Sequence, residues 1–453
     1  MRDYIYLAVL LACTLGAAAR PVFGYLAYVF FSTLNPRSMM WGVGLAFPFA
    51  EMLAIATMAG IVLQREHRPW ILTTEMKLLA IVWMLFGVTT IFGMQASEAF
   101  DQFVHVSKIL LMVFLSTYVI NTEDSFRHLC LVLSLSLGLV GLAAGVFFVT
   151  TGGVNMVYGP EQSFLESNNS VGLALAMNVP FLFYLARLEK RRWHRVLMRA
   201  MLLGSYPAII GTFSRGAWIA LAFASVVLWL GSRHKIVLAT LALLVIVVAL
   251  PRSSERLQTR YEDLRGYEQE ESAQSRLMIW HFAVNAALAS PLVGNGFSYY
   301  SIEAYQKYLP ELLYKYPGKV WSCHSTWFSI LSEHGFITFA VWLAMVIVCF
   351  RSLKDDRRRM SVGSERPWLG DYASMLRAAL MTYLVAGTFL DAAYFDLLYE
   401  MVAMTCILKR LVISGEIGAD VRDRSLEPIR RRSAPREPGR PPSQASRCAA
   451  ART

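Results

Sequence analysis

The sequence predicts an all-α, polytopic inner-membrane protein with about 12–13 transmembrane helices and one large extracytoplasmic loop containing short helices. The chain has 453 residues, of which 56% are hydrophobic, whereas soluble domains are about 45–50% apolar. The apolar residues form runs that can cross a hydrocarbon core of roughly 30 Å, which requires about 20 helical residues. Only one long polar interval, residues 251–325, interrupts these runs. Alternating strands of ~10 residues, typical of a β-barrel, are not found.

Thirteen apolar segments are expected to form membrane helices. They cover residues 4–19, 22–35, 42–63, 77–95, 105–121, 127–150, 170–187, 197–213, 215–231, 235–250, 326–350, 371–391 and 396–411. The first segment is followed at once by Arg20 and a second apolar run, so we interpret it as a retained span and not a cleaved signal peptide. These first two segments form either a tight hairpin or a pair in which one is re-entrant.

Basic loops predict the orientation of these helices, because Lys and Arg favour the cytoplasmic side. Such loops lie at residues 64–68, 187–199, 232–235 and 351–359. Alternating crossings then place residues 97–105, 151–169, the turn at Arg215 and the interval 251–325 together on the opposite, extracytoplasmic side. The sequence therefore predicts that the polar interval is an extracytoplasmic loop.

The net charge of +11 does not indicate nucleic-acid binding, because much of it lies in short loops and in the C-terminal tail. The six cysteines are scattered and form no CxxC pair, so we expect neither a disulfide framework nor a zinc site. No metal and no cofactor is expected.

Three regions follow from this pattern. Residues 1–150 would be N-terminal transmembrane helices, and residues 151–413 a transmembrane core that includes the loop 251–325. Residues 414–453 carry nine arginines among Pro, Ser and Ala, a composition that cannot bury a core. We expect a disordered, basic, cytoplasmic tail that either contacts anionic lipid headgroups or is simply a solvated extension.

Three polar residues at the predicted outer face are the candidates for catalysis. Arg215 lies between two apolar runs, where an arginine needs water, polar groups or an anion as its partner. Arg276 and His324 lie in the loop, the histidine just before an apolar run. Guanidinium groups match phosphate oxygens, and a histidine can act as a general base near neutral pH. Each also has an ordinary explanation: a snorkelling arginine, a surface charge, and a helix-start residue with Ser325 as N-cap.

Further candidates could bind substrate. Asn168 and Asn169 open a predicted span from the outer side and could bond a sugar or cap the helix. Tyr299 and Tyr300 belong to a tyrosine cluster that resembles a carbohydrate-stacking surface or an interfacial aromatic belt. Asp391, Asp396 and Glu400 lie near the outer ends of the last two spans and are weaker candidates, and His334 is expected to be a packed core residue.

The segment from Arg276 to Ala289 has helical periodicity and is too short to span a membrane. Leu277, Trp280, Val284 and Leu288 fall on or near one stripe, which predicts an amphipathic helix on the outer surface. The segment ends at the glycine-rich stretch 290–296, which we interpret as a turn in preference to a phosphate loop.

The order of these motifs resembles a known family. The motifs are Ser214-Arg215-Gly216, Arg276-x-x-x-Trp280, Pro291-Leu292-Val293-Gly294-Asn295-Gly296, His324-Ser325 and Gly335-Phe336-Ile337-Thr338. Together they resemble the O-antigen ligase and Wzy polymerase superfamily over residues 170–350. The segments 1–3, 34–37, 41–42, 47–50, 168–169 and 333–335 are similar to the exosortase A-associated O-glycosylation ligases. Thr338 departs from the ligase pattern, which has a second glycine there.

The resemblance implies a metal-independent glycosyl transfer at the periplasmic face of the inner membrane. The donor would be a glycan on undecaprenyl diphosphate, and the acceptor a glycan, a protein or a lipid. Arg215 and Arg276 would bind the diphosphate, and His324 would activate the acceptor hydroxyl or help to bind the diphosphate. The alternatives are a polymerase of exopolysaccharide repeat units and, from another class, a lipid or polysaccharide transporter.

Overall fold

The computed structural model describes residues 2–40, 47–64, 72–231, 268–361, 366 and 368–413. These residues form α-helices, one 3-10 helix and connecting turns, with no strand among them, which confirms the all-α prediction. The predicted span 235–250 and the tail from residue 414 lie outside the described residues. The chain divides into the units Met1–Leu411 and Val412–Thr453, and the contacts below belong to the first.

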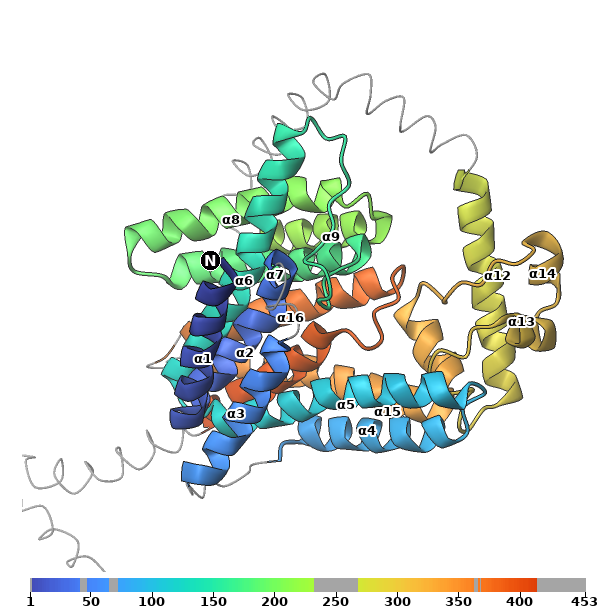
Figure 1. Ribbon diagram of the computed structural model, residues 1–453, viewed down its shortest axis with the longest axis horizontal. Helices are drawn as coiled ribbons and strands as arrows, with labels where there is room; N and C mark the ends of the chain where they lie inside the picture. Colours follow the sequence, from blue (N-terminus) through green and yellow to red (C-terminus); the bar gives the residue numbers. More distant parts are fainter. Residues whose placement is uncertain are drawn as a thin grey trace, which may run out of the picture. The chain divides into compact units, whose positions relative to one another are not determined.

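Three N-terminal helices pack against one another: α1 (Arg2–Ala19), α2 (Pro21–Leu34) and α3 (Phe49–Gln64) (Figure 1). Pro21 occupies the first turn of α2, where its missing N–H costs nothing. Arg20 alone separates α1 from α2, and the two helices contact each other; whether one of them is re-entrant stays a prediction. Asn35 ends α2 in the left-handed conformation, and the 3-10 helix η1 (Pro36–Met39) follows.

The next helices are α4 (Thr74–Ile91), α5 (Ala96–Val119) and α6 (Glu123–Thr150), and α4 lies beside α5 (Figure 1). A capping box between Thr122 and Ser125 begins α6, because each residue satisfies an amide of the other. Then come α7 (Asn168–Leu188), α8 (Arg192–Gly211) and α9 (Arg215–Gly231). α7 contacts α6, α8, α9 and α16 and is buried over most of its length.

The polar interval contains α12 (Glu268–Ala289), α13 (Ile302–Tyr308) and α14 (Glu311–Lys315), and α13 packs on α12 (Figure 1). α12 begins eight residues before Arg276, earlier than the periodicity predicts. Leu277 and Leu288 of the predicted apolar stripe are each 62% exposed, and the contact of this stripe with the membrane surface stays a prediction. The buried face instead contains Ile279, Phe282, Ala283 and Ala286.

The chain continues through α15 (Thr326–Ser361), α16 (Trp368–Gly387) and a last helix at residues 396–413. α15 bends at Gly335, whose φ of 75° is non-helical. Five described helices, α4 to α7 and α15, are long and apolar enough to cross a membrane, and α1, α2, α3 and α9 are apolar but shorter. The chain is thus a multi-pass membrane protein, and the total of 12–13 spans stays a prediction.

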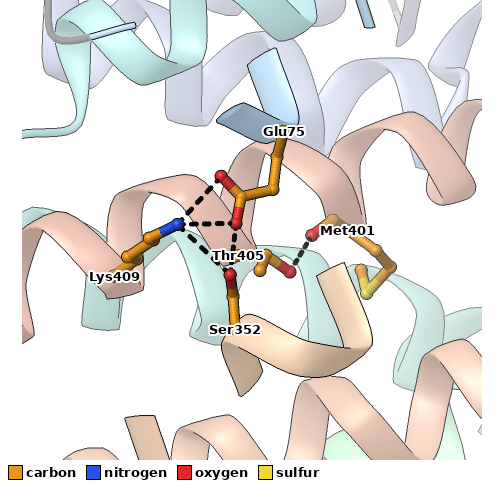
Figure 2. Close-up of polar contacts among 5 residues, drawn as sticks. All are labelled: Glu75, Ser352, Met401, Thr405 and Lys409. Atoms are coloured by element: carbon orange, nitrogen blue, oxygen red, sulfur yellow. Dashed lines mark hydrogen bonds and ion pairs between the residues drawn. The ribbon is translucent and has the colours of Figure 1, made fainter. Parts of the chain in front are cut away.

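A buried ion pair ties three helices together at one end of the protein. Lys409 on the last helix contacts both carboxylate oxygens of Glu75 on α4, at 3.0 and 3.3 Å (Figure 2). Ser352 of α15 donates to the same carboxylate and lies 3.3 Å from the lysine nitrogen. The Glu75 side chain is fully buried. Ser352 lies 26 residues after the start of α15, which corresponds to about 39 Å of helix.

At the other end, contacts join the segments predicted to share the outer side. Met94 donates its amide to Asn295 in the polar interval, at 2.8 Å. Asn168 donates to the carbonyl of Thr212 at 2.9 Å. The beginnings of α7, α9 and α15 therefore lie at the same end as α12, and the candidate site is built there.

Candidate functional site

Trp280 connects the α12 arginine to the candidate histidine. Arg276 and Trp280 are four residues apart and share one face of α12. The indole N–H of Trp280 donates to the carbonyl of Cys323 at 3.0 Å, and its ring stacks on Phe328 with centroids 5.1 Å apart. The residue before His324 is thereby fixed to the helix that carries Arg276. This contact gives a physical reason for the Arg276-x-x-x-Trp280 spacing.

α12 is itself anchored by a fully connected asparagine. The side chain of Asn295 donates to Ala286 on α12 at 3.1 Å and to Ser332 on α15 at 3.0 Å. Its oxygen accepts from Tyr308 on α13 at 2.6 Å. Asn295 is only 2% exposed, so these bonds replace those it would make to water. The helix bearing Arg276 is therefore held rigidly on α15.

The glycine-rich stretch 290–296 is a structural turn, as the sequence indicates. Gly294 and Gly296 have φ of 65° and 82°, in the left-handed region that favours glycine. The amide of Gly296 donates to the carbonyl of Glu333 at 2.8 Å. A Cβ on Gly294 would lie 2.3 Å from the same oxygen. These contacts pack the turn against the bend of α15 at Gly335.

His324 occupies a strained turn. Its φ is 47°, a conformation that non-glycine residues adopt at a cost of about 1–3 kcal/mol and that is concentrated at functional sites. The predicted side-chain cap by Ser325 is wrong, since that hydroxyl is buried and has no partner in the described part of the chain. Instead, Thr326 holds the start of α15 against the loop after α16.

Thr326 brings Asp391 beside His324. The amide of Thr326 donates to the carbonyl of Leu390 at 3.1 Å, and its hydroxyl accepts from the amide of Ala392 at 3.3 Å. Asp391 lies between these two bonds. Its carboxylate accepts a hydrogen bond from the hydroxyl of Ser329 at 3.0 Å. An aspartate that sequence alone ranks as a weak candidate is thus placed in the site.

Arg215 enters from the first turn of α9. Phe213, two residues earlier, has a φ of 51°, so this turn too is strained. A Cβ on Gly216 would lie 2.8 Å from Leu390, which gives a steric reason for the glycine after the arginine. Asn168 fixes the turn from α7 through its bond to Thr212. The same close packing joins Arg215 to the loop that carries Asp391.

A cavity of about 220 Å³, named here the His324 cavity, connects these elements. Its walls come from the start of α7, the turn before α15 and the loop after α16. The lining residues are Ser167, Asn169, Ser170, Leu173, Ser322, His324, Leu390, Asp391, Ala392 and Phe395. Arg215 is exposed and Arg276 half-buried at this end of the protein.

Arg215, Arg276, His324 and Asp391 lie close enough to influence one another's charge. Burial lowers the pKa of Arg276, and the positive charge of Arg215 lowers it further. Neither guanidinium pairs with a carboxylate within the described ranges. Two like charges held together in this way favour an anion with several oxygens.

The charge state of His324 is set by opposing neighbours. Burial lowers its pKa, Asp391 raises it, and Arg276 lowers it. The lowered pKa favours the neutral form of the imidazole, and a neutral imidazole has a nitrogen that can accept a proton. Asp391 is exposed to the cavity. The surrounding protein nevertheless desolvates its carboxyl group and raises its pKa, and the side chains of Ser322 and Ser329 partly offset this rise.

The remaining candidates divide between the site and the protein core. Asn169 lines the His324 cavity, whereas Asn168 is bonded to Thr212. Tyr299 is fully buried and stacks on Phe282 with centroids 5.6 Å apart. Tyr300 is half-buried and donates to Cys323 at 3.3 Å. The two tyrosines thus form part of the packing beneath His324, and a sugar-stacking role for them stays a prediction.

His334 is a core residue, as expected. It is fully buried. Its ring nitrogens lie 2.6 Å from the hydroxyls of Thr89 and Tyr394. Phe86 and Phe297 pack against the ring with centroids 4.4 and 4.5 Å away. This environment leaves no face of the ring for a substrate.

The fold and the site define a class: a multi-pass helical membrane protein with two arginines, a histidine and an aspartate gathered at one end. Residues 199–343 match the model of the O-antigen ligase family, and this segment contains Arg215, Arg276 and His324. Residues 1–190 match a family of unknown function (DUF5935). No curated protein matches the chain. The ligase match and the membrane helices together support a function of the membrane ligase or polymerase type.

Proposed function

We propose that the protein is a periplasmic-face glycan ligase of the inner membrane that transfers a glycan from undecaprenyl diphosphate to a protein or lipid hydroxyl. The observation that carries this proposal is the pairing of Arg215 and Arg276, without acidic partners in the described chain, beside a histidine flanked by Asp391. A diphosphate supplies the anion that this arrangement lacks. The O-antigen ligase match over residues 199–343 supports the same assignment.

In the proposed reaction, the two guanidiniums bind the donor's diphosphate oxygens. The acceptor hydroxyl lies at His324 and attacks the anomeric carbon from the side opposite the diphosphate. The new carbon–oxygen bond forms as the bond between the anomeric carbon and the phosphate oxygen breaks, and its electron pair leaves on the diphosphate. The imidazole takes the hydroxyl proton. Direct displacement of this kind inverts the anomeric configuration and needs no covalent enzyme intermediate.

Each residue then has a distinct contribution. The arginines stabilise the charge that develops on the leaving group, which is commonly the largest catalytic effect. Asp391 is a positioning residue that orients the imidazole and stabilises its protonated form. The left-handed turn at His324 fixes the base before substrate arrives, so little ordering is needed in the transition state. Asn169, which lines the His324 cavity, would bond a sugar hydroxyl.

Product analysis tests this proposal and separates ligase from polymerase. The purified protein is supplied with a defined undecaprenyl-diphosphate glycan and a mixture of acceptors. A modified protein or lipid supports the ligase, and a ladder of lengthened glycan on the polyprenyl carrier supports the polymerase. Movement of an intact lipid-linked glycan across vesicles, with no glycosidic bond broken, would instead support a transporter.

Matched variants connect the product to the site. Arg276→Ala and His324→Ala should lose product while inserting normally into membranes. Lys307→Ala serves as the control, because Lys307 lies on α13 in the same polar interval and its nitrogen lies over the ring of Tyr308, 5.0 Å from the centroid. Full activity in both site variants would refute the assignment of these residues.

A further inference from the structure

A second cavity lies next to the His324 cavity and is not used by the proposed reaction. It has a volume of about 400 Å³ and an inner annex of about 40 Å³. Its walls come from α2, α3, α5, the loop before α7 and the start of the last helix. Cavities of roughly 300–1,000 Å³ are typical of small-ligand sites. We name the cavity and its annex the α2–α5 chamber.

The chamber and the His324 cavity share two walls. In the loop before α7, Phe164 lines the chamber and Ser167 lines the His324 cavity. At the start of the last helix, Asp396 lines the chamber and Phe395 lines the His324 cavity. The rings of Phe164 and Phe395 meet edge-to-face at 5.7 Å. One aromatic pair therefore separates the two spaces, and a chain-like substrate could extend from one into the other by displacing it.

The floor of the chamber carries an unsatisfied carboxylate. Glu400 is 8% exposed and lines the annex. One of its oxygens accepts from the hydroxyl of Tyr25 at 2.7 Å, while the other has no partner in the described part of the protein. A buried acceptor without a partner is costly, and a ligand donor entering the annex would satisfy it. Asp396 adds a second carboxylate to the same wall.

The composition of the walls selects the chemistry of the ligand. Carboxylates accept hydrogen bonds from hydroxyl groups, and the rings of Tyr28, Phe31 and Phe164 offer apolar faces. An apolar prenyl chain would leave the acid groups without partners. The chamber walls also carry Arg37 and Lys108, but a diphosphate held between them would still face the carboxylates of Asp396 and Glu400 in the annex. A hydroxyl-rich carbohydrate satisfies both the acidic floor and the aromatic walls.

We propose that the α2–α5 chamber binds the sugar chain of a substrate whose reacting end lies at His324. The inference rests on the proposed glycan transfer and adds to it a recognition subsite built by the N-terminal helices. The sugar chain belongs either to the donor or to the acceptor, and the same chemistry serves for both. The chamber would make the enzyme selective for longer glycans, because only these reach past Phe164 and Phe395.

Length selectivity tests the chamber. The full-length protein is assayed with polyprenyl-diphosphate donors bearing one sugar or a complete repeat unit, and separately with short and long glycan acceptors. Ser32→Phe fills the chamber, while Ser32→Ala keeps it open. The wild type and Ser32→Ala should prefer the long substrate by about tenfold or more in kcat/KM, the effect of one hydrogen bond to a charged acceptor. Ser32→Phe should lose this preference and process the short substrate within about twofold of the wild type.

If the length preference depends on the chamber in the assays with different donors, the chamber binds the donor glycan. If it does so in the assays with different acceptors, the chamber binds the acceptor glycan. Equal length preference in Ser32→Phe and Ser32→Ala, in both arms, would overturn the proposal. Glu400→Gln gives a second variant that preserves the acceptor for Tyr25 and removes the charge. Its control is Asp101→Asn, which removes an exposed carboxylate on α5 outside the chamber.

A binding measurement separates failure of the chamber from failure of the proposed function. Saturation-transfer NMR records contact between the oligosaccharide released from the donor and full-length His324→Ala in detergent micelles. Contact that Ser32→Phe abolishes supports the chamber even if no donor is turned over. Absence of contact in both proteins overturns it even if glycan transfer is demonstrated.

Discussion

Replacing Arg276 with glutamine should weaken diphosphate binding without destabilising the protein. The guanidinium is half-buried, and both burial and Arg215 lower its pKa, so the unliganded protein gains nothing from the charge. Two N–H groups at the end of the guanidinium can donate two charge-assisted hydrogen bonds to the diphosphate, each contributing about 1.5–3 kcal/mol. Because the guanidinium is partly exposed to solvent, we take the lower end of this range for both hydrogen bonds, about 3 kcal/mol in total. Since 1.4 kcal/mol corresponds to tenfold, we expect roughly a hundredfold loss in affinity.

The assay is titration of the purified protein with undecaprenyl diphosphate, alongside thermal unfolding in the same detergent. Arg276→Lys should be intermediate, because lysine keeps the charge and loses the planar fork. Lys307→Gln removes a positive charge from α13, in the same polar interval as Arg276, and should bind undecaprenyl diphosphate with the wild-type affinity. An affinity within about threefold of the wild type in Arg276→Gln, or an equal loss in Lys307→Gln, would refute a specific diphosphate contact.

Four other outcomes follow from the structure. Activity should fall on the acid side as His324 becomes protonated, and in Asp391→Asn this acid limb should move to lower pH, because the carboxylate raises the histidine pKa; an unchanged pH–rate profile would contradict that coupling. Asn168→Ala removes the 2.9 Å bond to Thr212 and should cost about 1 kcal/mol in thermal unfolding, with a raised donor KM. Glu75→Ala leaves Lys409 unpaired and should cost about 3 kcal/mol with the KM unchanged, and a second replacement of Lys409 by Met should recover part of the loss. Equal stability of the single and double variants would show that the pair in Figure 2 contributes little.

The apolar runs predict most of the described helices because burial in lipid requires continuous apolar sequence and satisfied backbone. The same reasoning does not identify the face of α12 that packs on the protein, because this helix has apolar side chains on more than one face. Its orientation is decided by α13 and α15, which bury Phe282 and leave Leu277 exposed. Periodicity carries no information about such partners, and the start at Glu268 lies in a polar stretch without a hydrophobic signal.

For the site, the sequence predicts the candidate residues and the side of the membrane on which they lie. It does not predict which of them contact one another. Motif order selects Arg215, Arg276 and His324 as candidates, whereas the placement of Asp391 depends on bonds between Thr326 and the loop at Leu390, 64 residues away. Such a contact leaves no local pattern. The packing of the tyrosines is equally absent from the sequence pattern, because only the fold shows the ring of Tyr299 stacked on Phe282.

The central claim is that His324 and the paired arginines break a glycosyl–diphosphate bond. The most direct measurement is release of free undecaprenyl diphosphate by the purified protein from a defined lipid-linked glycan, followed together with formation of the glycosylated product. The account predicts one undecaprenyl diphosphate released for each glycosidic bond formed, and loss of both signals in His324→Ala while the donor still binds. Release and transfer at the wild-type rate in His324→Ala would contradict it.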